Sequence, residues 1–258
     1  MTALPIVLFN FFDFKTKFIL RISGFPKLNF LRTNLWKKFS KKIYKVTCPS
    51  KDLKKQLSDL NIFSHDKLFF LPDPIINVNE FILKSKKKFF KDVSLKNKYF
   101  IAVGRLTKQK NFNYLINEFN EFLKVNTNYD LLIFGEGEER NKLQLQINNL
   151  NLNKKVFLMG YSSHIYYYMK NAEALILSSL WEDPGFVLIE AAFCNLFIIS
   201  SDCKNGPKEF LSFGEGGMLF ESNKQKELQK MMQKFISIDK KRLEIMKIKA
   251  KTNSSNYT

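Results

Sequence analysis

Residues 99–135 read YFIAVGRLTKQKNFNYLINEFNEFLKVNTNYDLLIFG, a pattern typical of a strand, a helix and a second strand. The runs at 99–104 and 129–135 are short, apolar and end in glycine, as strands buried in a parallel sheet do. Between them, apolar residues recur at helical spacing over 111–124. A strand, a helix and a strand in this order form one βαβ unit, so the sequence predicts a parallel sheet.

The same alternation continues toward the C-terminus. Further strands are expected at 155–160, 173–178, 196–201 and 217–220. Helices are expected at 138–149 and 163–171, after Gly185, near Pro207, and over 223–250. Strand-like segments separated by helices and short gaps indicate an α/β domain with a doubly wound, Rossmann-like parallel sheet.

The N-terminal part contains two more strand-like runs, 17–23 and 43–48, each followed by a helical stretch. Pro72 and Pro74 then break regular structure, and a lysine-rich run follows. We therefore expect a partial N-terminal α/β region at 1–75, a linker at 76–97, the Rossmann-like domain at 98–222 and a C-terminal helical tail at 223–258.

The composition is strongly basic, with a formal net charge of +18. An AT-rich genome would produce the same abundance of lysine, and attraction toward anionic surfaces is the alternative explanation. Residues 29–45 mix aromatic and aliphatic side chains with lysines. They form either a basic amphipathic helix on an anionic membrane or a core-facing helix with a solvated face. Nucleic-acid-binding signatures are absent from the sequence, so nucleic acid is not an expected partner.

Cellular location is constrained by the cysteines and by the first residues. Cys48, Cys194 and Cys203 are isolated in sequence, so neither a zinc site nor a disulfide framework is expected, and a reducing compartment fits. Residues 1–12 are apolar but fall short of the ~20 residues that span a bilayer. We expect a cytoplasmic protein, with peripheral contact to the inner face of the cell membrane if the basic segment binds lipid.

Ligands of such sheets bind at the carboxyl ends of the strands, so the residues that follow each strand predict the site. The first strand is followed by Gly104 and Arg105, with Lys110 five residues beyond the arginine. Two cations on one loop can hold a diphosphate. The next two strands end in Gly135 and in Gly160-Tyr161, and we expect the turn at Gly135 to keep side chains out of the cleft.

The stretch 181–192, WEDPGFVLIEAA, places two carboxylates on either side of a predicted helix start. Glu182 lies in the loop, Gly185 lies at the helix start, and Glu190 lies about a turn and a half inside the helix. The first-turn amides of a helix have no intrahelical partners and carry the positive end of its dipole, which suits a phosphate. The two carboxylates could therefore bracket a phosphate-linked sugar.

Five spaced motifs within residues 98–222 carry a family resemblance: GRLTKQKN, FGEGEER, VFLMGY, LSSLWEDPGFVLIEA and SSDCKNGPKEFL. In this order they resemble the donor-binding half of the glycosyltransferase family 4 enzymes, which have the GT-B fold. The resemblance implies a retaining transferase that takes a sugar from a nucleotide-diphosphate sugar. It also implies a glycan or lipid-linked acceptor in cell-envelope polysaccharide synthesis.

The resemblance further implies roles for individual residues. Arg105 and Lys110 would bind the diphosphate and neutralise its charge, and Glu182 would contact the transferred sugar, which makes these three the catalytic candidates. Glu190 would bind the ribose hydroxyls, and Tyr161 would lie against the base. The remaining donor-binding residues would be the glycines and amides of the loops: Gly104, Gly135, Gly160, Gly185, Phe186, Val187 and Leu188.

Departures from the family pattern leave alternatives open. Asn195 stands where members usually carry glycine, and EDPG replaces EGFG. Residues 1–75 resemble only the last one or two α/β units of the acceptor-binding domain. The chain is therefore either an enzyme whose acceptor half comes from a second polypeptide, or an inactive nucleotide-sugar-binding fragment. Because no D-x-D sequence is present, we expect neither a bound metal nor a cofactor.

Overall fold

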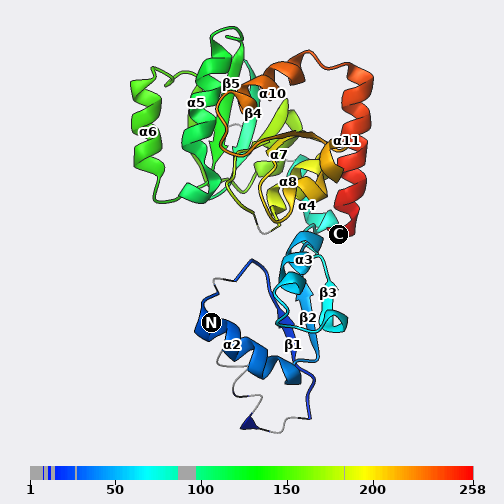
Figure 1. Cartoon of the computed structure of the whole chain (residues 1–258). Coiled ribbons are helices and arrows are strands. Elements are labelled where there is room, and N and C mark those ends of the chain that lie inside the picture. Colours follow the sequence, from blue (N-terminus) through cyan, green and yellow to red (C-terminus); the bar gives the residue numbers. More distant parts are fainter. Residues whose placement is uncertain are drawn as a thin grey trace. The chain divides into compact units, whose positions relative to one another are not determined.

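The computed structural model describes residues 15–26, 28–86, 97–182 and 184–257, together with Leu8, Phe11 and Phe12. The chain divides into two compact units, Met1–Asp73 and Pro74–Thr258 (Figure 1). Each unit has its own buried apolar cluster. The expected end of the N-terminal region, residue 75, lies two residues beyond the last residue of the first unit.

The N-terminal unit contains a small parallel sheet with the strand order β1-β2-β3. β1 (Ile19–Arg21) and β2 (Lys45–Cys48) fall inside the two strands expected from the sequence. β3 (Leu68–Phe70) was not expected, because it is three residues long and is followed directly by the Pro72 and Pro74 break. The helical elements of this unit are α2 (Phe30–Phe39), η1 (Ser40–Lys42), α3 (Lys51–Asp59) and η2 (His65–Lys67).

The second unit contains a parallel sheet in the order β6-β5-β4-β7-β8-β9. Its strands are β4 (Lys98–Val103), β5 (Tyr129–Phe134), β6 (Val156–Gly160), β7 (Ala174–Leu177), β8 (Phe197–Ser201) and β9 (Met218–Phe220). The first strand lies in the middle, and the chain winds outward from it in both directions. The doubly wound, Rossmann-like sheet predicted from the sequence is therefore confirmed.

Helices cover both faces of this sheet, and a separate apolar cluster fills each interface. One face carries α5 (Phe112–Leu123), α6 (Arg140–Asn149) and α10 (Glu227–Ile236). The other carries α4 (Val78–Lys86), α7 (Ile165–Asn171) and α8 (Phe186–Phe193) (Figure 1). Short helical segments complete the unit: η3 (Lys108–Lys110), α9 (Pro207–Phe210) and η4 (Ser212–Gly214).

The segment expected to be a linker contains helix α4, which belongs to the second unit. The Phe81 ring of α4 lies 5.0 Å from the Tyr166 ring of α7 and 4.7 Å from the Phe193 ring of α8. Residues 87–96 of the expected linker lie outside the described residues. Buried Phe81 therefore anchors α4 beside the sheet, and this anchoring positions the last turn of the helix next to the site described below.

The C-terminal segment expected to be one helical tail is two helices, α10 and α11 (Lys240–Ser254), which end in η5 (Ser255–Tyr257). Asp239 separates them, because its side chain caps α11 by accepting a hydrogen bond from the Arg242 amide. Tyr257 accepts hydrogen bonds at its carbonyl from the amides of Ile75 and Ile76. The C-terminal segment is thus packed into the second unit along its length.

Asn195, one of the two departures from the family pattern, follows α8 in a left-handed conformation with φ of +59°. Glycine adopts this conformation without strain, and asparagine tolerates it better than most other residues. This explains why asparagine can replace glycine here without disturbing the turn between α8 and β8.

Candidate donor-binding site

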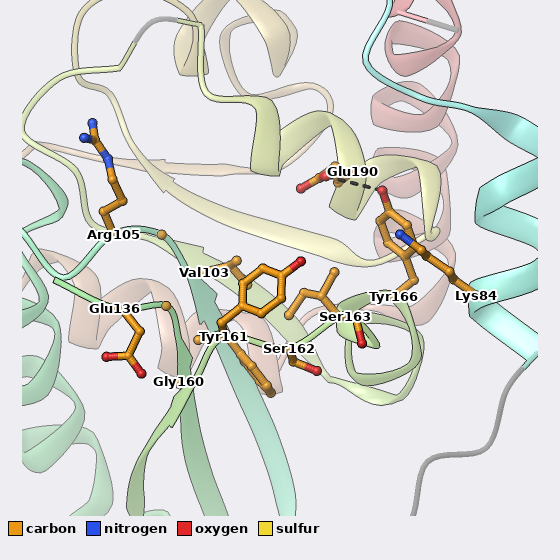
Figure 2. Close-up of a pocket in the computed structure, with 14 residues that line it drawn as sticks. Lys84, Val103, Arg105, Glu136, Gly160, Tyr161, Ser162, Ser163, Tyr166 and Glu190 are labelled. Carbon is orange, nitrogen blue, oxygen red and sulfur yellow. Dashed lines mark hydrogen bonds between the residues drawn. The ribbon is translucent and has the colours of Figure 1, made fainter.

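A pocket of about 510 Å³ opens at the carboxyl ends of β4, β5 and β6 (Figure 2). α4, α7 and α8 contribute the rest of its wall. The lining residues are Lys84, Val103, Gly104, Arg105, Phe134, Gly135, Glu136, Gly160, Tyr161, Ser162, Ser163, Ile165, Tyr166 and Glu190. The volume is within the range typical of small-molecule sites. The position is the edge at which parallel α/β sheets bind ligands.

Six of the residues expected to bind a donor line this one pocket: Gly104, Arg105, Gly135, Gly160, Tyr161 and Glu190. They come from three strand ends and one helix, spread over 87 positions of sequence. Arg105 and Tyr161 are both exposed, with the Tyr161 side of the pocket open to solvent. Figure 2 shows Arg105 at one end of the pocket, Lys84 at the other and Tyr161 between them.

Lys110 and Glu182, which the sequence assigns to different parts of the donor, form an ion pair. Lys110 Nζ lies 2.5 Å from Glu182 Oε1, and both side chains are largely buried. The stem of Lys110 runs along Gly104, where an added Cβ would lie 2.9 Å from Lys110 Cε. This pair is therefore next to the pocket, and each partner offsets the charge of the other.

Glu182 is held on several sides. The Ser179 hydroxyl donates to Glu182 Oε1 at 2.5 Å, and the Glu182 amide donates to the carbonyl of Lys204. Its Cγ would lie 3.5 Å from a Cβ added to Gly185. A series of neighbouring residues therefore runs from the pocket through Gly104 and Lys110 to Glu182 and Gly185, just before α8.

α8 begins as the sequence predicts, with Gly185 as its N-cap residue in a left-handed conformation of φ +85°. Gly185 has no side chain, so no side chain from the cap position accepts the first-turn amides. The Leu188 amide donates to the Gly185 carbonyl at 2.9 Å in an i−3 bond, so it has a backbone partner in the first turn. Phe186 and Val187 retain the amide positions expected to face a ligand.

Glu190 projects from α8 into the pocket, where it is half-buried. Burial raises the pKa of its carboxyl group, and the Tyr166 hydrogen bond and the charge of Lys84 act in the opposite direction. The Tyr166 hydroxyl donates to Glu190 Oε1 at 3.3 Å. Burial also raises the pKa of Tyr166, with the Glu190 charge as the next cause, so the phenol stays protonated as a donor.

The turn at Gly135 differs from the expectation that it keeps side chains out of the cleft. Glu136 lines the pocket and pairs with Arg140, with Oε1 3.2 Å from Nη1. A Cβ on Gly135 would overlap the carbonyl oxygen of Gly104, and one on Gly137 would crowd the backbone of Leu106. The glycines are therefore needed so that this turn can pack against the loop after β4.

Sequence reasoning missed several lining residues, most of which no local pattern marked. Lys84 lies in a lysine-rich run that resembles a solvated linker. Tyr166 is one of three consecutive tyrosines on α7, and only the fold reveals which one faces Glu190. Ser162 and Ser163 directly follow Tyr161, so the expected ligand contact at Tyr161 was the available signal for them.

A parallel sheet with a pocket at its carboxyl edge, cationic side chains and a glycine-started helix is an arrangement typical of α/β domains that bind phosphorylated ligands. Residues 84–252 match the family described as Glycosyl transferases group 1, and the chain belongs to this family.

Individual relatives agree with this assignment. The chain is 40% identical over 151 residues to an uncharacterised glycosyltransferase of Methanocaldococcus jannaschii, a match that covers 58% of this chain and 35% of the relative. It is 28% identical over 249 residues to an N-acetylgalactosamine-N,N'-diacetylbacillosaminyl-diphospho-undecaprenol 4-alpha-N-acetylgalactosaminyltransferase of Campylobacter jejuni, covering 95% and 67%. The chain thus spans about a third of the first relative and two thirds of the second.

Solved structures show the same fold. A glycosyltransferase from Rickettsia africae superposes with a TM-score of 0.81 at 17% identity, covering 98% of this chain and 69% of the other. The Anabaena protein HepE, solved in complex with UDP, superposes with a TM-score of 0.80 at 14% identity, covering 98% and 71%. Both comparisons support the GT-B-type architecture inferred from the sequence motifs.

Proposed function

We propose that this chain binds a nucleotide-diphosphate sugar and transfers the sugar to a glycan or lipid-linked acceptor in cell-envelope polysaccharide synthesis. The observation that carries the proposal is the continuous arrangement of Arg105, the Lys110–Glu182 pair and the start of α8 beside one pocket. A diphosphate bound there would meet two cationic side chains and the positive end of a helix dipole.

The proposed chemistry breaks the bond between the sugar and the diphosphate, and negative charge develops on the leaving diphosphate. Arg105 and Lys110 stabilise that charge, with the Phe186 and Val187 amides as further donors. Glu182, already fixed by Ser179, accepts hydrogen bonds from the sugar hydroxyls. Retention of anomeric configuration and independence from a metal are part of the proposal, carried over from the family resemblance.

Uridine diphosphate is the first donor nucleotide to test. HepE and the pneumococcal O-GlcNAc transferase GtfA are solved with UDP, and HepE also with UDP-glucose. The envelope acceptor rests on relatives named a lipopolysaccharide 1,6-galactosyltransferase in Salmonella typhimurium and a poly(ribitol-phosphate) alpha-N-acetylglucosaminyltransferase in Staphylococcus aureus. These nucleotides and acceptors are those of the relatives, and they determine which ones are tested first with this chain.

The test is a thermal-shift screen against UDP, GDP, ADP and CDP, followed by assay of nucleotide release from the matching sugar donors. Ligand binding to the folded state raises the melting temperature, by an amount that grows with the logarithm of ligand concentration over the dissociation constant. Stabilisation by one nucleoside diphosphate at millimolar concentration supports the proposal. Absence of a shift with all four, confirmed by calorimetry, contradicts it.

One alternative is that the chain binds a sugar nucleotide but has no activity. The other is that the chain is one half of a split enzyme and is active only together with a second polypeptide. The specific observation that keeps them open is the three-stranded N-terminal unit, which is small beside the second unit. Release of nucleotide in the presence of acceptor extracts from the native cells favours the enzyme. Nucleotide binding without release, in all extracts, favours the fragment.

Peripheral contact with an anionic membrane, from a cytoplasmic location, is a separate part of the proposal. On α2, Phe30 and Leu31 are 81% and 77% exposed, and Lys37 and Lys38 lie exposed in the last turn. Exposed apolar side chains and cations on one helix fit a bilayer that contains acidic lipids. Within the described part of the chain, no helix has the length and hydropathy needed to cross a bilayer.

Vesicle sedimentation tests this contact. We expect binding to vesicles containing phosphatidylglycerol, little binding to pure phosphatidylcholine, and loss of binding when Phe30 and Leu31 are both changed to Ser. The matched control changes Ile245 and Ile248 of α11, which are exposed to 58% and 60%, to Ser. Equal binding of both double variants, or preference for duplex DNA over the acidic vesicles, contradicts the membrane proposal.

A further inference from the structure

The pocket has a second cationic end that the donor-binding residues do not explain. Lys84 reaches it from α4, on the side opposite Arg105 (Figure 2). Phe81, one turn earlier on α4, is buried against Tyr166 and Phe193. Because this aromatic contact fixes α4 against α7 and α8, the position of Lys84 at the pocket is set by the core.

Tyr166 and Lys84 both act on Glu190. The Tyr166 hydroxyl donates to Glu190 Oε1 at 3.3 Å, and a carboxylate oxygen has a second lone pair that can accept from another donor. Lys84 pairs with Glu80 on its own helix at 2.5 Å, and its positive charge also acts on Glu190 and Tyr161. A half-buried carboxylate thus has one partner that orients it and one that offsets its charge.

We propose that Tyr166 and Lys84 are positioning residues that keep Glu190 oriented and ionised as the acceptor for two neighbouring ribose hydroxyls, so that the pocket selects ribonucleotides over 2'-deoxyribonucleotides. The inference rests on the proposed function, since it concerns the nucleotide of the same donor. An ionised carboxylate offers only acceptors, whereas a protonated one turns one oxygen into a donor. Loss of orientation or of charge therefore weakens the hold on both hydroxyls.

The direction in which acidification changes the ribonucleotide preference follows from the groups around Glu190. Burial raises the Glu190 pKa, and Tyr166 and Lys84 lower it, so removal of either partner raises it further. The preference for the ribonucleotide is present above that pKa and is lost as pH falls through it. The charged and titratable groups that line the pocket beside Glu190 are Lys84 on α4, Arg105 after β4, Glu136 after β5, Tyr161 after β6 and Tyr166 on α7. Glu80 pairs with Lys84, and Cys194, just after α8, also interacts with Glu190.

The first test compares UDP with 2'-deoxy-UDP by calorimetry between pH 5.5 and pH 8.5. The two ligands have the same diphosphate, so their affinity ratio reports the ribose contact alone. We expect a ratio of about tenfold for the unchanged protein at high pH, the size of one to two lost hydrogen bonds. Tyr166→Phe should reduce this ratio at least about threefold, while Tyr167→Phe, one position along α7, should leave it unchanged.

The second test uses Lys84→Met, with Lys84→Arg as the charge-conserving rescue. The methionine variant should lose its ribose preference at a higher pH than the unchanged protein, and the arginine variant should restore the original midpoint. Lys84 is partly exposed, so its replacement tests the inference even if Tyr166→Phe fails to fold.

The results of these tests distinguish failure of the positioning role from failure of the proposed function. If UDP binds but neither Tyr166→Phe nor Lys84→Met changes the ratio or its pH midpoint, the positioning role is wrong and the proposed function stands. If no nucleoside diphosphate binds the unchanged protein, both are wrong.

Discussion

Lys110 and Glu182 show what residue-level reasoning supplies and what it leaves out. Their positions in the GRLTKQKN and LSSLWEDPGFVLIEA motifs marked both for the site, yet their pairing across 72 positions of sequence is visible only in the fold. A folded protein is strongly destabilised when a buried carboxylate loses its cationic partner, whereas removal of both charges is often tolerated. The pair therefore makes a stability prediction that is independent of any ligand.

We predict that Lys110→Met lowers the free energy of unfolding by about 3 kcal/mol or more, since it leaves Glu182 charged and buried. Adding Glu182→Gln should recover most of that loss, because the glutamine needs no counter-charge. Urea unfolding of the two single variants and the double variant measures the coupling. Additive effects would show that the two side chains do not interact in solution.

At the same scale, the sequence predicted five of the pocket residues because the carboxyl ends of parallel strands meet at one edge, and it predicted Glu190 from the helix that follows Gly185. It could not find Lys84 or Tyr166. The first depends on Phe81 packing α4 against α7, and the second on which of three tyrosines faces α8. Such contacts depend on tertiary packing, and local patterns carry no information about them.

The helices and strands predicted most accurately are those for which the apolar periodicity and the flanking turn residues indicate the same element. α5 satisfies both conditions, and its buried side chains include Leu115, Ile116 and Phe119. β3 was not predicted, because a strand of three residues shows too little periodicity to be recognised. The helix expected over 223–250 is two helices, because Asp239 caps the start of α11. Boundaries set by a single capping residue are the features that periodicity alone misses.

The start of α10 is capped by a side chain from another helix, α5, and this contact gives a second prediction. Glu118 of α5 is buried and accepts hydrogen bonds from the Lys226 and Gln229 amides at 2.9 and 3.1 Å, at the start of α10. Glu118→Ala should cost about 2–3 kcal/mol of unfolding free energy, since two amides lose a charged acceptor. Glu121→Ala, on the same helix but half-exposed and paired with Lys124, should cost no more than about 0.5 kcal/mol. Equal losses on chemical denaturation would mean that Glu118 does not cap α10.

For the whole molecule, every residue that lines the pocket belongs to the second unit. A chain that begins at Pro74 should therefore fold and bind UDP within about threefold of the full protein, because it keeps every lining residue and its own apolar core. Calorimetry on the two proteins measures this ratio. A large loss of affinity, with the helical circular dichroism intact, would place part of the nucleotide site in the N-terminal unit.

The central claim is that a diphosphate binds between Arg105, Lys110 and the start of α8. Calorimetric titration with uridine, UMP and UDP tests it most directly, in the unchanged protein, in Arg105→Ala and in an Arg242→Ala control at an exposed position of α11. The account predicts that affinity rises at least about tenfold from UMP to UDP, and that Arg105→Ala removes most of this gain while Arg242→Ala keeps it. Equal affinity for UMP and UDP, or a gain that survives in Arg105→Ala, would contradict the account.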